Sequence, residues 1–158
     1  MDPSLKQYLG KFNIKYKEHK HPAVFTVEES KKIDKGIPGL HTKNLFLYDD
    51  NENFYLVCLP ADKRLNIKLL KQILNSRDLH FGSPEMLKAH LNITPGSVSL
   101  FNMIYAKDVE LVIDKAVWDA EITGFHPNEN TSTLEITKEG LEKFYNSLRG
   151  KKRIVHLG

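Results

Sequence analysis

The segment at residues 39–44 (GLHTKN) contains a lysine that could take part in chemistry. Lys43 stands here, directly before an apolar run at 45–48. A lysine at the mouth of a buried strand can direct its ammonium group into a cleft, where it meets a phosphate or a polarised carbonyl. A solvated lysine at a strand end is the ordinary alternative, and the lysine alone does not decide between the two.

Two further polar segments have a composition that suits a binding site. The turn at 94–99 (TPGSVS) contains Gly96, which exposes backbone groups to anything that approaches closely. The segment 124–131 (GFHPNENT) joins two apolar stretches, and turn chemistry explains its residues except His126. The structural alternatives are an ordinary connection in the first case and a capping or core-edge histidine in the second.

The sequence lacks the motifs that are typical of several enzyme classes. The sequence contains no GxxxxGK[ST], GxGxxG, HExxH or GxSxG pattern. His19 and His21 form a closely spaced histidine pair, but no third ligand has suitable spacing, so we expect no metal site. Cys58 is the single cysteine, which excludes an internal disulfide. It lies within an apolar run, where a cysteine packs as a small hydrophobe more readily than it acts as a nucleophile.

These segments lie between predicted strands and helices. The apolar runs 45–48 and 54–59, joined by polar residues 49–53, predict a β-hairpin whose second strand is buried on both faces. Candidate N-caps at Thr26, Asn66, Ser83 and Thr137 and apolar periodicity predict the other elements. These are helices at 5–9, 27–33, 67–74, from 84 and after 137, and strands at 14–16, 109–113, 121–125 and 131–136. Hairpins mixed with helices favour an α/β or α+β fold over a doubly wound parallel one.

Length and charge bound the function. The chain has 158 residues, 41% of them hydrophobic, which predicts one domain over 1–158 with its own core. No long apolar run and no secretory signal is present, so we expect a soluble cytoplasmic protein without a membrane partner. The net charge of +3, from 23 Lys+Arg and 20 Asp+Glu, does not fit a polybasic DNA binder.

The segments singled out above, with two more, resemble the YbaK/ProX superfamily of aminoacyl-tRNA editing domains. They occur in family order: 21–29 (HPAVFTVEE), 39–47 (GLHTKNLFL), 59–64 (LPADKR), 95–98 (PGSV) and 124–131 (GFHPNENT). Within the superfamily the likeness is to the free-standing prolyl-tRNA deacylase-like branch, PrdX or ProXp-ala, and it covers about 9–157. It implies a mixed β-sheet or partly open barrel flanked by helices, with no metal or organic cofactor.

The resemblance also implies an activity, which is hydrolysis of the ester of a mischarged tRNA, with alanine on tRNA for proline as the expected substrate. Lys43 matches the family's essential lysine, and its neighbours Thr42 and Asn44 are expected to bind substrate. An aminoacyl ester is already activated, so it needs no covalent nucleophile. The family's mechanism implies that a ribose hydroxyl of the substrate assists the attacking water, while Lys43 orients the aminoacyl end.

Two loops complete the expected site. Gly96 matches the first position of the family's Gly-x-x-x-Pro loop, whose backbone holds the aminoacyl group, and Ser97, which follows it, is also expected to bind substrate. His126 matches a pocket-lining histidine, and Asn128 in the same segment is also expected to bind substrate. Leu100 departs from the pattern because it stands where the loop proline is usual, which leaves the preferred amino acid open.

The remaining expectations concern partners and specificity. A pocket that admits alanine can exclude the larger proline sterically. Candidate walls are Val24, Phe25 and Leu45, for which core packing is an equal alternative. The tRNA would be bound by Lys63 and Arg64, and a prolyl-tRNA synthetase is a candidate partner.

Three functions remain open from the sequence. A trans-editing deacylase is favoured by the retention of Lys43, Gly96 and His126. A non-catalytic tRNA- or aminoacyl-binding module that recruits or regulates a synthetase is the second, and Leu100 keeps it open. An unrelated small hydrolase that uses Cys58 is the third, and thiol alkylation would test it.

Overall fold

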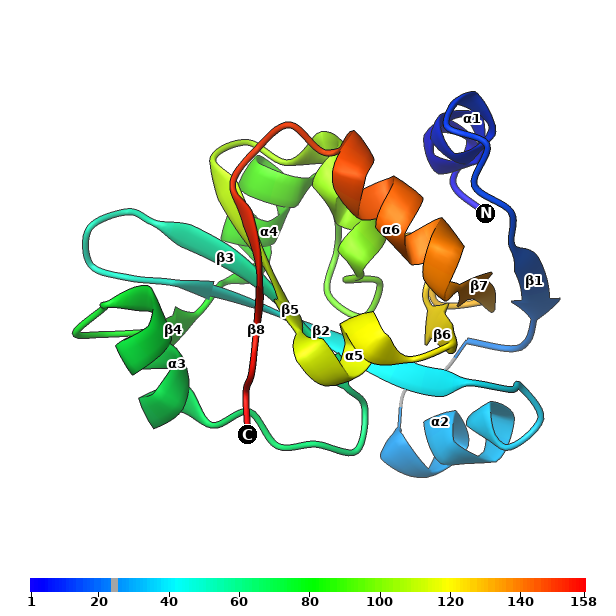
Figure 1. Cartoon of the computed structure of the whole chain (residues 1–158), viewed down its shortest axis with the longest axis horizontal. Coiled ribbons are helices and arrows are strands. Elements are labelled where there is room, and N and C mark those ends of the chain that lie inside the picture. The colour runs from blue at the N-terminus through cyan, green and yellow to red at the C-terminus, as the bar shows by residue number, and fades with distance from the viewer. Residues whose placement is uncertain (24–25) are drawn as a thin grey trace.

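The computed structural model describes residues 1–23 and 26–158, and its centre is an eight-stranded mixed sheet. The strand order is β1-β7-β6-β2-β3-β5-β8, and β4 pairs with β2 beside this path (Figure 1). Within the described residues the strand path does not close into a barrel, and the predicted mixed sheet flanked by helices is confirmed. The strands are β1 (Lys17–Lys20), β2 (Leu40–Tyr48), β3 (Phe54–Pro60), β4 (His80–Phe81), β5 (Val109–Asp114), β6 (Ile122–Phe125), β7 (Ser132–Thr137) and β8 (Lys152–Val155).

The helices begin at capping residues, several of which the sequence predicts. In each α-helix a side chain of Asp, Thr, Asn or Ser at the N-cap accepts a backbone N–H of the first turn. The predicted caps Thr26, Asn66, Ser83 and Thr137 are confirmed. The helices are α1 (Pro3–Lys11), α2 (Val27–Asp34), α3 (Ile67–Leu74), α4 (Pro84–Leu91), the 3₁₀ helix η1 (Leu100–Tyr105), α5 (Lys115–Asp119) and α6 (Lys138–Ser147).

The hairpin of β2 and β3 is the base on which the site is built. Its register runs from Thr42 opposite Pro60 to Tyr48 opposite Phe54. Side chains of β3 alternate between two apolar clusters, Leu56 on the side of α1, α4, α6 and η1 and Val57 on the side of α3. Both faces of β3 are therefore buried, as predicted, and β2 is held along its length by this strand.

The sequence prediction is less accurate for the first strand. The alternation at 14–16 predicts a strand there, but β1 begins at Lys17. Asn13 adopts a positive φ of 57° just after α1, and the Ile14 N–H donates to the Leu9 carbonyl at 2.9 Å, so this segment closes the helix. Ile14 is buried in the core all the same, which explains its place in the apolar pattern.

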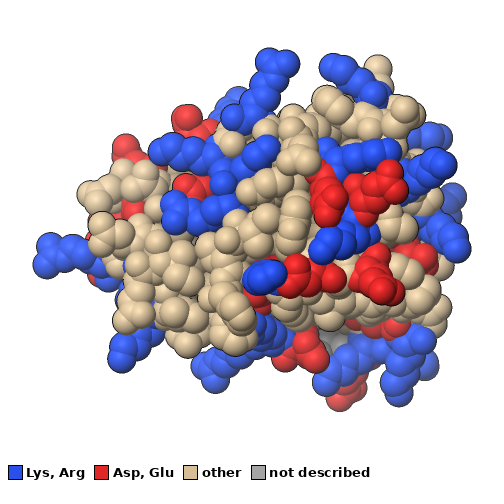
Figure 2. Space-filling view, viewed as in Figure 1, with Lys and Arg blue, Asp and Glu red and all other residues tan. Residues whose placement is uncertain are grey.

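The surface carries both signs of charge. On the face shown in Figure 2, Lys and Arg surround groups of Asp and Glu without a continuous field of one sign. This face agrees with the small net charge of +3. Among the described residues, no helix is both long and apolar enough to cross a membrane.

Candidate active site

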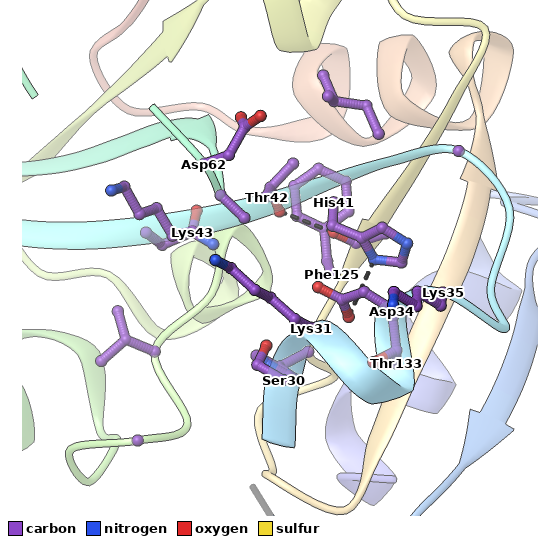
Figure 3. Close-up of a pocket in the computed structure, with 18 residues that line it drawn as sticks. Ser30, Lys31, Asp34, Lys35, His41, Thr42, Lys43, Asp62, Phe125 and Thr133 are labelled. Atoms are coloured by element: carbon purple, nitrogen blue, oxygen red, sulfur yellow. Dashed lines mark hydrogen bonds and ion pairs between the residues drawn. The ribbon is translucent and has the colours of Figure 1, made fainter. Parts of the chain in front are cut away.

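A cavity of about 780 Å³ lies between α2 and the start of β2, within the range of about 300–1,000 Å³ that is typical of small-molecule sites (Figure 3). Its walls come from segments that are distant in the sequence: α2, β2, the turn after β3, the 94–99 turn and the β6–β7 hairpin. The lining residues are Ser30, Lys31, Asp34, Lys35, Gly39, Leu40, His41, Thr42, Lys43, Asn44, Ala61, Asp62, Gly96, Val98, Gly124, Phe125, His126 and Thr133.

A short parallel pairing of β2 with β6 joins the two main polar segments. Leu40 lies opposite Thr123 and His41 opposite Gly124. The Thr42 hydroxyl extends this contact by donating to the Gly124 carbonyl at 2.8 Å. A Cβ atom at Gly124 would lie 3.1 Å from His41 Nδ1, so this close approach favours glycine. The predicted neighbourhood of 42–44 and 124–126 is thus built by backbone pairing.

Lys43 and Asn44 keep polar atoms unpaired in the cavity wall. The Lys43 ammonium forms no hydrogen bond or ion pair within the part of the chain that the structure describes. The Asn44 Oδ1 atom is buried and has no hydrogen-bond partner there either. An unpaired buried amide oxygen costs free energy, so it is a group that a bound ligand can satisfy.

His126 presents a neutral ring to the cavity. Burial is the main reason that its pKa lies below the usual 6.5, and the nearby His21 and His41 act in the same direction. Its Nδ1 atom lies 3.2 Å from the Ser132 carbonyl oxygen. Because a carbonyl only accepts, Nδ1 carries the proton and Nε2 retains a lone pair. The residue can therefore accept a hydrogen bond from a ligand.

The sequence does not reveal the pair formed by His41 and Asp34. His41 Nδ1 lies 3.3 Å from Asp34 Oδ1, and Nε2 lies 2.8 Å from the Ile37 carbonyl oxygen. The pair joins the end of α2 to the start of β2 at the edge of the cavity, as Figure 3 shows. Asp34 and His41 lie on different elements, so neither helical nor strand periodicity indicates the contact.

The 94–99 turn contributes its backbone and one apolar side chain. Gly96 has a φ of 89°, and nothing lies within 4 Å of a Cβ atom placed there, so its backbone faces open space in the cavity. Ser97 stabilises the turn, since its N–H donates to the Thr94 carbonyl at 3.3 Å, but it is not a lining residue. Val98 lines the cavity in its place.

Asn128 lies in the core beside the site. Its Oδ1 accepts from Asn102 Nδ2 at 2.6 Å and from the Ser99 hydroxyl at 3.3 Å, and its Nδ2 donates to Asp2 at 3.1 Å. These bonds tie the 126–129 loop to η1 and to the first helix. The structure therefore gives Asn128 a supporting position and places no part of it in the cavity wall.

The two cations predicted to bind tRNA also lie outside the cavity wall. The Lys63 ammonium donates to Asp114 Oδ2 at 2.9 Å, and the Asp114 side chain is only 1% exposed. Arg64 is exposed. Two other lysines line the cavity instead, Lys31 of α2 and Lys35, which caps the end of that helix. The sequence analysis missed them because α2 is mostly polar and shows no apolar stripe from which its inner face could be inferred.

Of the three candidate wall residues, the structure describes only Leu45. Leu45 packs against the apolar cluster beneath α3 and does not line the cavity. Val24 and Phe25 lie outside the described residues. Leu100 is fully buried in the main core, so the departure from the family's loop proline falls behind the cavity wall.

Cys58 is inaccessible, and no metal cluster is found. The side chain is fully buried, and burial followed by the nearby Asp114 raises the pKa of the thiol well above its usual range. A thiol in this environment is neither ionised nor reachable, which argues against the cysteine hydrolase. Residues 1–23 and 26–158 contain no group of three or more His, Cys, Asp or Glu side chains that could hold a metal ion.

The chain is similar to known proteins in both sequence and fold. A family model described as "Aminoacyl-tRNA editing domain" matches residues 21–144. The chain is 35% identical over 138 residues to "Prolyl-tRNA editing protein ProX" of Acetoanaerobium sticklandii, covering 85% of this chain and 84% of that protein. It is 31% identical over 144 residues to "Prolyl-tRNA synthetase associated domain-containing protein 1" of Danio rerio, covering 89% and 78%. The fold matches the crystal structure of "a putative trans-editing enzyme for prolyl tRNA synthetase" with a TM-score of 0.74, at 15% identity over 99% and 98% of the two chains.

Proposed function

This chain belongs to the aminoacyl-tRNA editing domain family, and from that premise we propose that it hydrolyses the ester bond between a mischarged amino acid and tRNA. Because the relative from A. sticklandii is named for prolyl-tRNA editing, we propose tRNA for proline as the carrier and alanine as the amino acid. The observation that carries the proposal is one cavity that holds an unpaired lysine, Lys43, and a neutral histidine, His126.

The proposed reaction is a direct attack of water on the ester. The water oxygen bonds to the carbonyl carbon, the bond from that carbon to the ribose oxygen breaks, and the ribose oxygen takes up a proton. The ester needs no covalent nucleophile, because positioning and stabilisation of developing charge supply most of the rate. This agrees with the absence of a reachable thiol at Cys58. The ribose hydroxyl next to the ester assists the water.

Each lining group has a proposed role in this reaction. The Lys43 ammonium orients the aminoacyl adenosine and offsets negative charge on the carbonyl oxygen. The unpaired Asn44 amide oxygen and the His126 Nε2 lone pair accept hydrogen bonds from the substrate's ammonium and hydroxyl groups. The open backbone at Gly96 allows the aminoacyl group to approach closely.

The size of the amino acid is the proposed basis of selectivity. Val98 and Phe125 provide apolar parts of the cavity wall, and a larger ring such as that of proline is excluded by contact with this wall. Leu100 does not enter this argument, because its side chain is buried in the core. A prolyl-tRNA synthetase is the proposed source of the mischarged tRNA, since the reaction needs an enzyme class that makes such an ester.

The test is deacylation of alanyl-tRNA for proline by the wild type, with cysteinyl, seryl and prolyl esters of the same tRNA as comparisons. Release of alanine while prolyl-tRNA survives supports a size-excluding deacylase. Cleavage of a different ester keeps the deacylase and changes the proposed amino acid. Binding of the tRNA without cleavage of any ester overturns the proposal in favour of a binding module.

A further inference from the structure

One face of α2, extended by the capping residue Lys35, presents two lysines to the cavity. Ser30 and Asp34 are four residues apart, as are Lys31 and Lys35, and Lys35 keeps helical dihedral angles, so these residues share one face, which lines the cavity. Figure 3 shows Lys31 extending from α2 toward β2, the strand that carries Lys43. Lys31 forms no ion pair or hydrogen bond with any described residue.

Among the described residues, neither acidic residue of the lining forms an ion pair with these lysines. Asp34 instead contacts His41 Nδ1 at 3.3 Å. Asp62 lies after β3 on another wall and is exposed. The cavity therefore has unpaired ammonium groups on two sides, Lys31 on α2 and Lys43 on β2. Two separated cations of this kind suit a ligand with more than one polar or anionic group.

We propose that Lys31 binds a backbone phosphate of the 3′-terminal strand of the tRNA, while Lys43 acts at the ester. This inference rests on the proposed function, because the anionic groups of such a substrate are its phosphates. The cavity is large enough for an aminoacyl adenosine. When that nucleoside is bound inside, the phosphate on its 5′ side lies at the rim, where the RNA strand exits the cavity. Lys31 is exposed at the end of a flexible stem, which suits a phosphate contact that positions the strand without reading a base.

The chain supplies a matched control one residue away. Lys32 has the same charge on the same helix and is exposed, but it does not line the cavity. Lys31→Gln and Lys32→Gln therefore remove the same charge from the protein, and only the first removes it from the cavity. Lys31→Arg keeps the charge and is the rescue variant.

The experiment measures binding of an acceptor-stem minihelix whose 3′ end carries alanine through a stable amide. The slope of log K against log salt should be smaller by about 0.7 in Lys31→Gln, the value for one phosphate contact on a single strand. Between about 50 and 200 mM salt, wild-type binding then weakens about 2.6-fold more than Lys31→Gln binding. Lys32→Gln and Lys31→Arg should keep the wild-type slope. All four proteins should bind 3′-alanylamino-3′-deoxyadenosine, which has no phosphate, equally well.

The outcomes separate this inference from the proposed function. Equal slopes for Lys31→Gln and Lys32→Gln overturn the phosphate contact, even if the wild type deacylates its substrate. Weaker binding of Lys31→Gln to the phosphate-free nucleoside overturns it too, because the lysine would then act on another group. A wild type that fails to deacylate but shows the Lys31-dependent slope overturns the proposed function and supports the contact.

Discussion

Replacing Lys43 by glutamine should remove most of the deacylation activity and leave the stability of the fold unchanged. Replacing Lys63 by glutamine should lower the stability and leave the deacylation activity unchanged. The same sequence resemblance led us to expect a functional role for both lysines, but their surroundings in the structure differ. Lys43 lines the cavity and has no partner among the described residues. The Lys63 ammonium lies 2.9 Å from the carboxylate of Asp114, outside the cavity wall.

The magnitudes follow from these contacts. A substitution that breaks no contact changes the free energy of unfolding by at most about 0.5 kcal/mol, which is the expectation for Lys43→Gln. Loss of one preorganised group that stabilises developing charge slows catalysis about 10²- to 10³-fold. In Lys63→Gln the Asp114 carboxylate, 1% exposed, keeps only long contacts of 3.4 Å to the N–H groups of Ala116 and Leu157. The Lys63 side chain is 25% exposed, so breaking this ion pair costs less than breaking a fully buried one. We expect Lys63→Gln to lower the free energy of unfolding by about 1.5–3 kcal/mol, which corresponds to a fall of about 3–12 °C in Tm.

Single-turnover deacylation and thermal unfolding followed by circular dichroism, on both variants and the wild type, decide the matter. If Lys43→Gln keeps its rate within tenfold of the wild type, the electrostatic role of Lys43 is refuted. If Lys63→Gln loses activity at an unchanged Tm, the lysine contacts tRNA as the sequence predicts, and the structural role assigned to its ion pair is wrong.

Three other positions give independent tests. Burial lowers the pKa of His126, so below about pH 6.5 this residue binds a proton more readily in the unfolded chain than in the folded chain. The free energy of unfolding should therefore fall as the pH drops below about 6.5. Urea titrations at several pH values should show a smaller fall for His126→Gln. Native protein should resist iodoacetamide at the fully buried Cys58 and keep its activity, and mass spectrometry that finds rapid alkylation together with inactivation would restore the cysteine hydrolase. Gly82→Ala places a Cβ atom against Cδ2 of the buried Phe46 ring, so the free energy of unfolding should fall by about 1–3 kcal/mol. Denaturant unfolding measures this fall, and an unchanged midpoint would contradict the packing described.

Local chemistry made much of the fold predictable. The hairpin at 45–59 combines two apolar runs with a polar connection, and each helix cap needs only one side chain and the N–H groups next to it. The same applies to Gly96, whose turn the sequence shows directly. β4 and β8 were not predicted, because β4 has two residues and β8 begins with two cations, so neither shows an apolar alternation.

The parts of the site that the sequence did not show depend on tertiary placement. Whether Lys63 or Lys31 faces the cavity depends on how the chain passes the end of β3 and on which face of α2 turns inward, and neither sequence segment contains that information. The contact of Asp34 with His41 likewise arises only when α2 is folded back onto β2. Asn128 belongs to a motif that resembles the family's pocket, but its side chain is held by Asn102 and Asp2.

The short pairing of β2 with β6 has a consequence for how the molecule opens. Its register comprises the pairs Leu40–Thr123 and His41–Gly124, whereas β2 and β3 are paired over seven positions from Thr42 to Tyr48. This ladder is the shortest along the strand path, so we expect local unfolding to separate β6 from β2 before it disturbs the hairpin. The cavity spans this seam between β2 and β6. A ligand that contacts both sides of the seam binds only while β2 and β6 are paired. Ligand binding therefore stabilises this pairing, and loss of the pairing weakens ligand binding.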